Sequence, residues 1–329
     1  MRTLFGLWCL LIAALVPAQA QERAQDRAQD SYPSKAITLV VPVPPGGAAD
    51  FIARLIGQKL SEAVGQPVVI SNRGGAGGTI ASDNVAKSAP DGATLMLNSI
   101  TTHGIGPHLY ASLPYDSVRD FTPVILVARL PLIMTINTGH AMKSVADVVA
   151  YAKANPGKLS FASSGNGGAP HLSGELFQTV AGIKMLHVPY RGSGPAVVDV
   201  GAGRVDIMFD AVPSLLALIQ AGKLRPLAAA SAERNPIVPD APTFGELGIK
   251  GMEISLWYGI AGPAGLPPSI VQRLNTELAA ILKTAEVRDA FAKQGAAASG
   301  GSPQDYAAFM REESSRWGEV VRRNNIKIE

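Results

Sequence analysis

The hydrophobic positions of this chain alternate between short apolar runs and helically spaced patterns, beginning at residue 36. Residues 36–43 are rich in β-branched side chains and are bounded by Pro and Gly, which predicts a buried strand. Residues 50–64 place apolar side chains at helical spacing. Two more strands are predicted over 67–71 and 94–99, with a helix over 79–88 between them. This alternation favours an open, mostly parallel α/β sheet.

The middle of the chain repeats the alternation. Strands are predicted over 124–128, 132–137, 158–162, 186–189, 206–210 and 224–231, and helices over 144–155, 172–180, 195–201 and 212–221. A Pro-rich stretch predicted to be a loop follows, and then helices over 268–284, 285–294 and 303–324. We therefore expect two α/β lobes and two crossings between them. Residues 35–127 plus 231–329 would form lobe 1, and residues 128–230 would form lobe 2.

The N-terminal segment has the pattern of an export signal. Residues 1–20 combine Arg2, an apolar stretch over 4–16 and the small-residue cleavage pattern of residues 18–20, which is typical of a secretory signal peptide. Residues 21–34 are polar and predict a flexible leader. No twin-Arg pair precedes the apolar stretch, so we expect export to the periplasm by the general secretion route.

Composition excludes several classes of protein. The chain has 329 residues, of which 47% are hydrophobic, and this apolar share rules out wholesale disorder. The only cysteine, Cys9, lies in the predicted signal, which excludes a disulfide framework and a multi-cysteine metal site. The net charge of +3 is too small to indicate a nucleic-acid surface. The five histidines show no metal-ligand spacing, and no nucleotide-binding or hydrolase motif is present, so we expect no metal and no cofactor.

Two similar glycine-rich junctions carry the candidate chemistry, one in each predicted lobe. Residues 44–50 (PPGGAAD) and 163–171 (SSGNGGAPH) each join a strand to the N-terminus of a helix. The first N–H groups of a helix have no intrahelical partner, and the helix dipole makes them attractive to an anion. Two such loops facing each other would hold a small carboxylate without Lys or Arg. The alternative is that the glycines serve only the geometry of tight turns.

Several long motifs together resemble one receptor family. PVPPGGAADFIARLI, NRGGAGGTIASDNVAKSAPDGATL, FASSGNGGAPHLSGELF, HVPYRGSGPAVVDVGAGRVDIMFD and PDAPTFGELG occur in the expected order. They resemble the solute-binding receptors of tripartite tricarboxylate transporters, the Bug family. The resemblance implies a type II periplasmic binding-protein fold, with two α/β lobes, a double crossover and a ligand cleft between the lobes. It also implies that a carboxylated solute is captured and handed to a membrane permease.

The resemblance also implies a set of ligand-binding residues. The first loop supplies Pro45, Gly46, Gly47, Ala48 and Asp50, and the second supplies Ser163, Ser164, Gly165, Asn166, Gly167, Gly168 and His171. Tyr190, Arg191, Gly192 and Ser193 match a third loop, and Asp210 matches the acidic end of the next strand. The sequence departs from the family pattern at Val43, where relatives commonly carry a larger or aromatic residue.

Some of these residues have a structural alternative. Asp50 is placed to cap its helix, and His171 and Arg191 are as well suited to ordering the loops as to touching a ligand. Ser99, Thr101 and Thr102 end the third strand and are candidates to supply hydroxyl groups. Trp257 and Tyr258 are expected to pack in the core or at the hinge.

The sequence thus favours a monomeric periplasmic receptor that closes on a small carboxylic acid. The expected ligands are a dicarboxylate or tricarboxylate, an acidic amino acid or an aromatic acid, and the expected partners are the permease subunits. Two other functions remain open at this point. One is an exported enzyme, for which His171, Asp50 and Asp210 are the only candidate groups and no spacing links them. The other is a sensory adaptor that contacts a membrane kinase when it is liganded.

Overall fold

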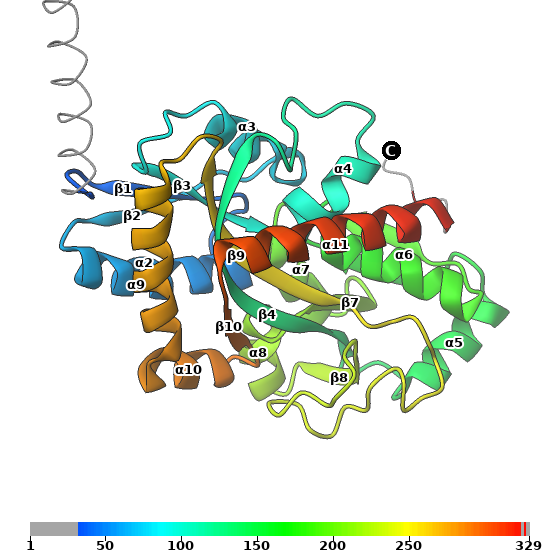
Figure 1. Cartoon of the computed structure of the whole chain (residues 1–329). Helices are drawn as coiled ribbons and strands as arrows, with labels where there is room; N and C mark the ends of the chain where they lie inside the picture. Colours follow the sequence, from blue (N-terminus) through cyan, green and yellow to red (C-terminus); the bar gives the residue numbers. More distant parts are fainter. Residues whose placement is uncertain (1–31, 324–325, 327–329) are drawn as a thin grey trace, which may run out of the picture.

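The computed structural model describes residues 32–323 and 326. The predicted signal peptide, most of the predicted leader and the last residue predicted for the C-terminal helix lie outside the described residues. Within the described part, no helix is long and apolar enough to cross a lipid bilayer. Figure 1 shows two α/β lobes side by side, with the N-terminal strands at one end of the molecule and α5 and α6 at the other.

The first sheet contains the N-terminal strands. Strands β2 (Val68–Asn72), β1 (Ile37–Val41) and β3 (Thr94–Ser99) are parallel neighbours. Strand β9 (Ser255–Pro263) runs antiparallel between β3 and β4 (Phe121–Asn137), and β10 (Ala297–Gly300) pairs with β4 on its other side. Because β1 is buried along its length, it consists of the continuous β-branched and apolar run that the sequence shows.

The second sheet is built around the other end of β4. Strands β7 (Ile207–Ala211) and β8 (Leu224–Ala229) pair antiparallel with β4. Strands β5 (Ser160–Ser163) and β6 (Leu186–Pro189) continue the sheet from β7 in parallel. The full strand order is β2-β1-β3-β9-β4-β7-β5-β6, so β4 belongs to both sheets.

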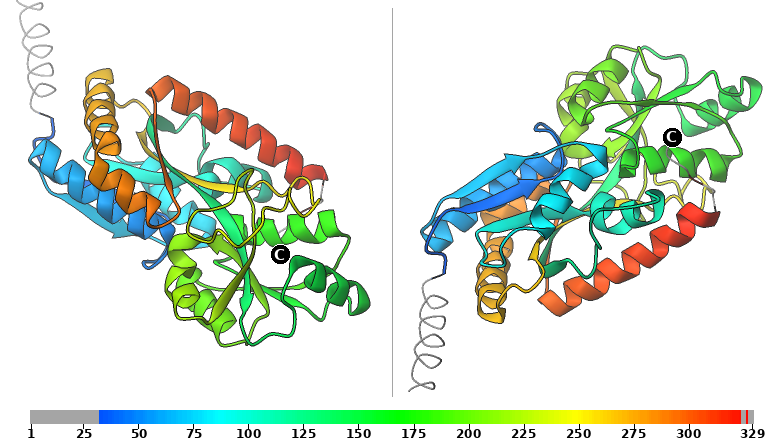
Figure 2. Two further views of the ribbon diagram at one scale, coloured as in Figure 1. Left: turned by 90° about the horizontal axis from the view of Figure 1, so that it is seen from below. Right: turned by 90° about the horizontal axis from the view of Figure 1, so that it is seen from above.

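Helices cover both sheets, as the two views in Figure 2 show. The first sheet is accompanied by two helices that follow its N-terminal strands, α2 (Ala48–Val64) and α3 (Thr79–Ala86). The C-terminal helices also belong to it: α9 (Pro268–Lys283), α10 (Ala285–Ala292) and α11 (Pro303–Arg323). Those of the second sheet are α5 (Val145–Ala154), α6 (Ala169–Ala181), α7 (Ser193–Gly201) and α8 (Val212–Gln220). A 3-10 turn, Ala76–Gly78, precedes α3, and a π-helical turn, Ile100–Ile105, leads from β3 into the short α4 (Gly106–Leu109).

The chain passes between the sheets where β4 changes partner. Pro131 is the last β4 residue paired with β9, and Leu132 is the first paired with β7. The chain returns beside this point, because Ala230 N–H donates to the Leu132 carbonyl (2.8 Å) and Leu132 N–H donates to the Ile254 carbonyl (3.2 Å). The predicted two-lobed α/β fold with a double crossover is confirmed, whereas the residue boundaries of the lobes stay a prediction.

Three local expectations differ from the structure. The strands predicted over 124–128 and 132–137 are one strand of 17 residues, since Pro131 lies at the change of partner, where its missing N–H is tolerated. Strand β9 was not predicted, because its nearly continuous apolar run does not by itself distinguish a strand from another buried segment. Strand β10 was also not predicted, because four small residues give no hydrophobic pattern.

Candidate ligand-binding site

A small cavity lies between the two sheets, where the carboxyl ends of the parallel strands face each other. Its volume is about 60 Å³. It is lined by Pro42, Val43, Pro44, Gly47, Ala48, Ala49, Ser99, Thr101, Ser164, Pro170, Gly192, Ser193, Asp210, Leu256 and Tyr258. These residues come from both lobes, as expected for a site in a crevice at a switch in strand order. None of them is Lys, Arg or His.

The first glycine loop brings the N-terminus of α2 to the cavity. Gly47 is the N-cap of α2 and has no side-chain capping hydrogen bond, so the first amides of the helix have no side-chain acceptor. Gly46 has a φ of +95°, which a residue with a Cβ adopts only with strain. Backbone N–H groups and the positive end of the α2 dipole therefore lie at the cavity.

Asp50 supports this loop from behind. Its Oδ2 accepts hydrogen bonds from Gly46 N–H (3.2 Å) and Arg54 Nε (3.0 Å), and its Oδ1 accepts one from Asn72 Nδ2 (3.1 Å). Burial alone would raise the pKa of Asp50, but these donors outweigh it and hold the pKa below its usual value. The carboxylate is already satisfied by the protein and does not line the cavity. The structure places Asp50 as a group that orders the loop.

The second glycine loop is held by a stacked pair of histidines, of which His171 is buried and His187 half-buried. Gly167 N–H donates to His171 Nδ1 (3.2 Å), and the His171 ring stacks on His187 at 4.0 Å between centroids. His187 Nε2 is hydrogen-bonded to Ser163 Oγ (2.7 Å). Burial lowers the pKa of His171 to about 3 and that of His187 to about 4, so both rings are neutral near pH 7. From this loop only Ser164 reaches the cavity, together with Pro170 at the start of α6.

The third loop contributes Gly192 and Ser193, at the N-terminus of α7. A Cβ placed on Gly47 would lie 3.8 Å from the Ser193 Cβ, so the loops of the two lobes approach each other to within the space of one added methyl group. Tyr190 does not reach the cavity, because its hydroxyl donates to Asp199 Oδ2 (2.7 Å). Burial and this hydrogen bond raise the pKa of Tyr190 to about 12. Arg191 is exposed and also lies outside the cavity.

Asp210 is the one acid that lines the cavity. It is 2% exposed, and its Oδ1 accepts a hydrogen bond from Ala211 N–H (2.7 Å). The hydroxyls of Ser193 and Ser214 lie close enough to lower its pKa, but burial prevails and raises the pKa to about 6. Neither hydroxyl makes a well-formed hydrogen bond to Oδ2, which has no partner among the described residues. The Asp210 carboxyl therefore lines the cavity and has one oxygen without a hydrogen-bond partner among the described residues.

The side of the cavity opposite the loops is formed by neighbouring strands β3 and β9. Ser99 ends β3 and is paired with Tyr258 on β9. Burial, and then the nearby charge of Asp210, raise the pKa of Tyr258, so its hydroxyl keeps its proton. Thr101 lies in the π-helical turn that follows β3, a kind of turn often found at functional sites.

The structure thus divides the residues expected from the sequence. Eight of them line the cavity: Gly47, Ala48, Ser99, Thr101, Ser164, Gly192, Ser193 and Asp210. The others lie outside its lining: Pro45, Gly46, Asp50, Thr102, Ser163, Gly165, Asn166, Gly167, Gly168, His171, Tyr190 and Arg191. Tyr258 and Leu256 were not among the expected site residues, because β9 was not predicted. Among residues 32–323 and 326, no group of three His, Cys, Asp or Glu side chains is arranged to hold a metal ion.

Comparison with known proteins identifies the family. The model of the tripartite tricarboxylate transporter family receptor, TctC, matches residues 52–326. The chain belongs to this family. It is therefore a periplasmic-type solute-binding protein and not an enzyme, which confirms the expectation from the sequence motifs.

Individual relatives agree along almost the whole chain. The UPF0065 protein of the tcbD–tcbE intergenic region of a Pseudomonas species is 43% identical, over 94% of this chain and 92% of that protein. BugT of Bordetella pertussis is 39% identical, over 91% of this chain and 92% of that protein.

Solved structures show the same architecture. A structure described as a periplasmic transporter is 40% identical, with a TM-score of 0.88 over 91% of this chain and 100% of that chain. Rpa4515 of R. palustris, solved with adipate, is 39% identical, with a TM-score of 0.87 over 90% of this chain and 99% of that chain. MatC of Rhodopseudomonas palustris, solved with malate, is 34% identical, with a TM-score of 0.84 over 88% of this chain and 100% of that chain.

Proposed function

We propose that this receptor binds a small aliphatic dicarboxylate between its lobes and delivers it to the membrane permease of a tripartite tricarboxylate-type transporter. The observation that carries the proposal is the lining of the cavity, which offers helix N-terminal amides and hydroxyls from both lobes but no cationic side chain. Such a site attracts a carboxylate through oriented dipoles. The relatives solved with adipate and malate support the choice of a dicarboxylate.

The binding cycle requires the lobes to open. A cavity of about 60 Å³ is far smaller than the roughly 300–1,000 Å³ typical of ligand pockets, which supports the proposal that this conformation is the closed one. We propose that opening bends the chain where Leu132, Ala230 and Ile254 meet, because only the two crossing segments join the sheets there. Closure then removes the ligand from water.

Ligand binding is tested by calorimetry and thermal shift with adipate, malate, citrate and aspartate. We expect at least one dicarboxylate to raise the melting temperature in a concentration-dependent manner, because a ligand that binds only the folded protein stabilises it by mass action. Hexanediol, which has no carboxylate, serves as the control for adipate. Failure of every acid to bind at millimolar concentration would overturn the proposal.

We further propose that residues 1–20 direct export by the general secretion route and are then removed. The supporting pattern is the apolar stretch followed by the small residues 18–20. N-terminal sequencing of the protein recovered from a periplasmic extract should begin at Gln21. A mature chain that still carries the first 20 residues would contradict this route.

A further inference from the structure

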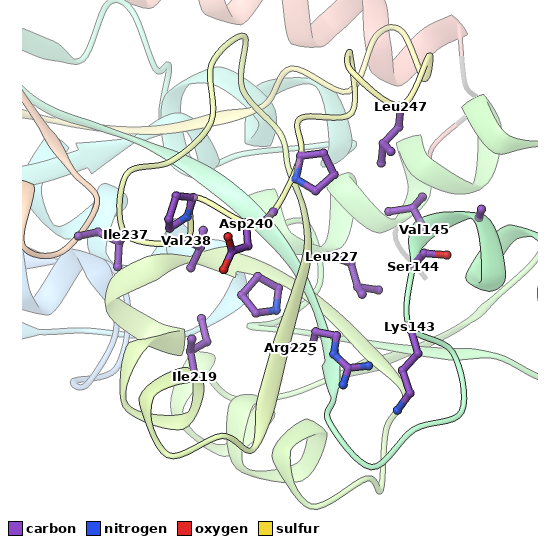
Figure 3. A pocket seen from close by; sticks show the side chains of 15 residues that line it. Lys143, Ser144, Val145, Ile219, Arg225, Leu227, Ile237, Val238, Asp240 and Leu247 are labelled. Atoms are coloured by element: carbon purple, nitrogen blue, oxygen red, sulfur yellow. The ribbon is translucent and has the colours of Figure 1, made fainter.

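A second cavity lies on the far side of lobe 2 from the interlobe site. Its volume is about 550 Å³, and none of its lining residues also lines the interlobe cavity. As Figure 3 shows, its walls are β8, the start of α5, the end of α8 and the segment 237–242. That segment is fixed to β8, since Ala229 N–H donates to the Pro242 carbonyl (2.8 Å) and Phe244 N–H donates to the Ala229 carbonyl (3.1 Å).

Most of the cavity surface is apolar. Val145, Leu227, Val238 and Ala241 are buried at its floor, and Ile219 and Ile237 complete the wall. The volume falls within the range in which proteins bind small organic molecules. An occupant would therefore need an apolar body to match these side chains.

The cavity also contains a guanidinium group with no counter-charge. Arg225 extends from β8 into the cavity, and its Nη1 is buried without a hydrogen-bond partner among the described residues. Buried polar groups normally have partners, and an unpaired guanidinium nitrogen is costly to desolvate. Arg225 makes no ion pair in the part of the chain that the structure describes, although many surface arginines there do. The described part of the protein thus supplies no acceptor for this nitrogen, although Arg225 lines a cavity large enough to admit a ligand.

The charges around Arg225 favour an anion. Lys143 lines the same cavity, and its Nζ donates only to the carbonyl oxygens of Thr138 (3.2 Å) and His140 (2.6 Å). The single acid of the lining, Asp240, is exposed and comes from the segment 237–242, and it makes no ion pair within the described residues. Two cations against one exposed acid give this cavity a net positive character, in contrast to the interlobe cavity.

We propose that this cavity is a second binding site, for a small organic acid with one carboxylate and an apolar body. The carboxylate pairs with the guanidinium of Arg225, with Lys143 nearby, and the apolar body covers Leu227 and Val238. A guanidinium binds a carboxylate through parallel N–H donors, which gives both strength and orientation. The site is independent of the proposed dicarboxylate site and differs from it in using a cationic side chain.

Benzoate is a suitable probe, with benzyl alcohol as the matched neutral compound. Calorimetry on the full chain should show that benzoate binds and that benzyl alcohol binds at least tenfold more weakly. Arg225→Met should bind benzoate at least tenfold more weakly than the wild type while keeping its affinity for adipate. Arg288→Met, a change at an exposed residue of α10 that lines neither cavity, should bind benzoate like the wild type.

The location of the probe is tested without relying on a variant. A wild-type crystal soaked with 4-bromobenzoate should give an anomalous bromine peak among Leu227, Val238 and Arg225. No benzoate binding at millimolar concentration, equal binding of benzyl alcohol, or a bromine peak only in the interlobe cavity would each overturn the second site. Loss of adipate binding with benzoate retained would instead count against the proposed function alone, so the two failures are distinguishable.

Discussion

The carboxyl group of Asp210 lines the interlobe cavity and combines burial with an oxygen that has no hydrogen-bond partner in the described part of the chain. In its neutral form the group donates a hydrogen bond to a ligand carboxylate, and in its charged form it repels that carboxylate. Its pKa of about 6 places this change near neutral pH. Dicarboxylate affinity should therefore be constant below about pH 6 and fall up to about tenfold per pH unit above it. Calorimetry at a series of pH values measures this slope.

Asp210→Asn separates this effect from other titrations. The amide donates a hydrogen bond at every pH, so the variant should bind the dicarboxylate with little dependence on pH above 6. It should also melt at a higher temperature than the wild type near pH 8, because the raised pKa of Asp210 means that stability is lost as pH rises through about 6. A wild-type affinity that does not change between pH 5 and 8 would show that Asp210 does not donate to the ligand.

Gly47 allows a second test at the level of a single residue. Its backbone has φ −108° and ψ −175°, which any residue adopts, so Gly47→Val should still fold, at a cost of about 1 kcal/mol because Val is a poorer N-cap residue than Gly. The branched side chain would occupy the space in front of the α2 amides and lower dicarboxylate affinity by more than about tenfold. A Cβ alone makes only ordinary contacts with Ser193 and Ser214, so Gly47→Ala should lose much less dicarboxylate affinity than Gly47→Val. Wild-type affinity in Gly47→Val would mean that the ligand does not approach this loop.

The residues of the site were predictable where the signal is local. Gly47, Ser99 and Asp210 each lie at the end of a predicted strand, and parallel strands bring such ends together. Tyr258 reaches the same cavity on a strand distant in the sequence, which no local pattern reveals. Asp50 and His171 accept hydrogen bonds from their own loops, which the sequence does not reveal, and whether either touches a ligand stays a prediction.

At the scale of elements, the stacked His171 and His187 connect α6, β6 and the second glycine loop. Their lowered pKa values mean that folding keeps both rings neutral, whereas the unfolded chain binds protons below about pH 6.5. Stability should thus be complete above this pH and decrease as pH falls toward the folded values. His171 alone should account for about 2 kcal/mol of lost unfolding free energy at about pH 5. Urea titrations between pH 7.5 and 5 provide the measurement.

His171→Gln is the matched variant for this effect. Glutamine retains an acceptor for Gly167 N–H but does not titrate, so the acid-dependent loss should shrink while the loop is held. If the variant loses as much stability between pH 7.5 and 5 as the wild type, His171 is not the cause of the acid-dependent loss of stability.

Most elements were predictable because their periodicity is strong, but two of the strands were not. Helix α2 alternates its buried and exposed faces over 17 residues, so its pattern is unambiguous. Strand β9 is buried on nearly every residue and has the length of a short apolar run, which does not distinguish a strand from a core segment. The joining of two predicted strands into β4 depends on partners from both sheets and is a tertiary effect.

At the scale of the whole molecule, the closeness of Gly47 to Ser193 offers a test of closure. A distance of 3.8 Å between their Cβ positions matches disulfide geometry, and the only native cysteine, Cys9, lies in the predicted signal. Gly47→Cys combined with Ser193→Cys should therefore form a disulfide readily. X-ray scattering of the ligand-free variant should show a smaller radius of gyration when oxidised than when reduced. Each single cysteine variant controls for the substitutions, and identical oxidised and reduced profiles would refute an opening motion.

The place of β9 has a consequence for how this chain acquires its structure. Strand β3 ends at Ser99, yet its neighbour β9 begins only at Ser255, so the edge of the early strands stays unpaired while the intervening residues are made. Contacts this distant in the sequence slow folding, because a long segment must be ordered before they form. Strands β4 to β8 of the second sheet follow one another in the sequence, so that sheet needs no such distant partner. A newly made chain would thus complete its first sheet only when its last third arrives, a delay that would favour the export of an unfolded chain proposed above.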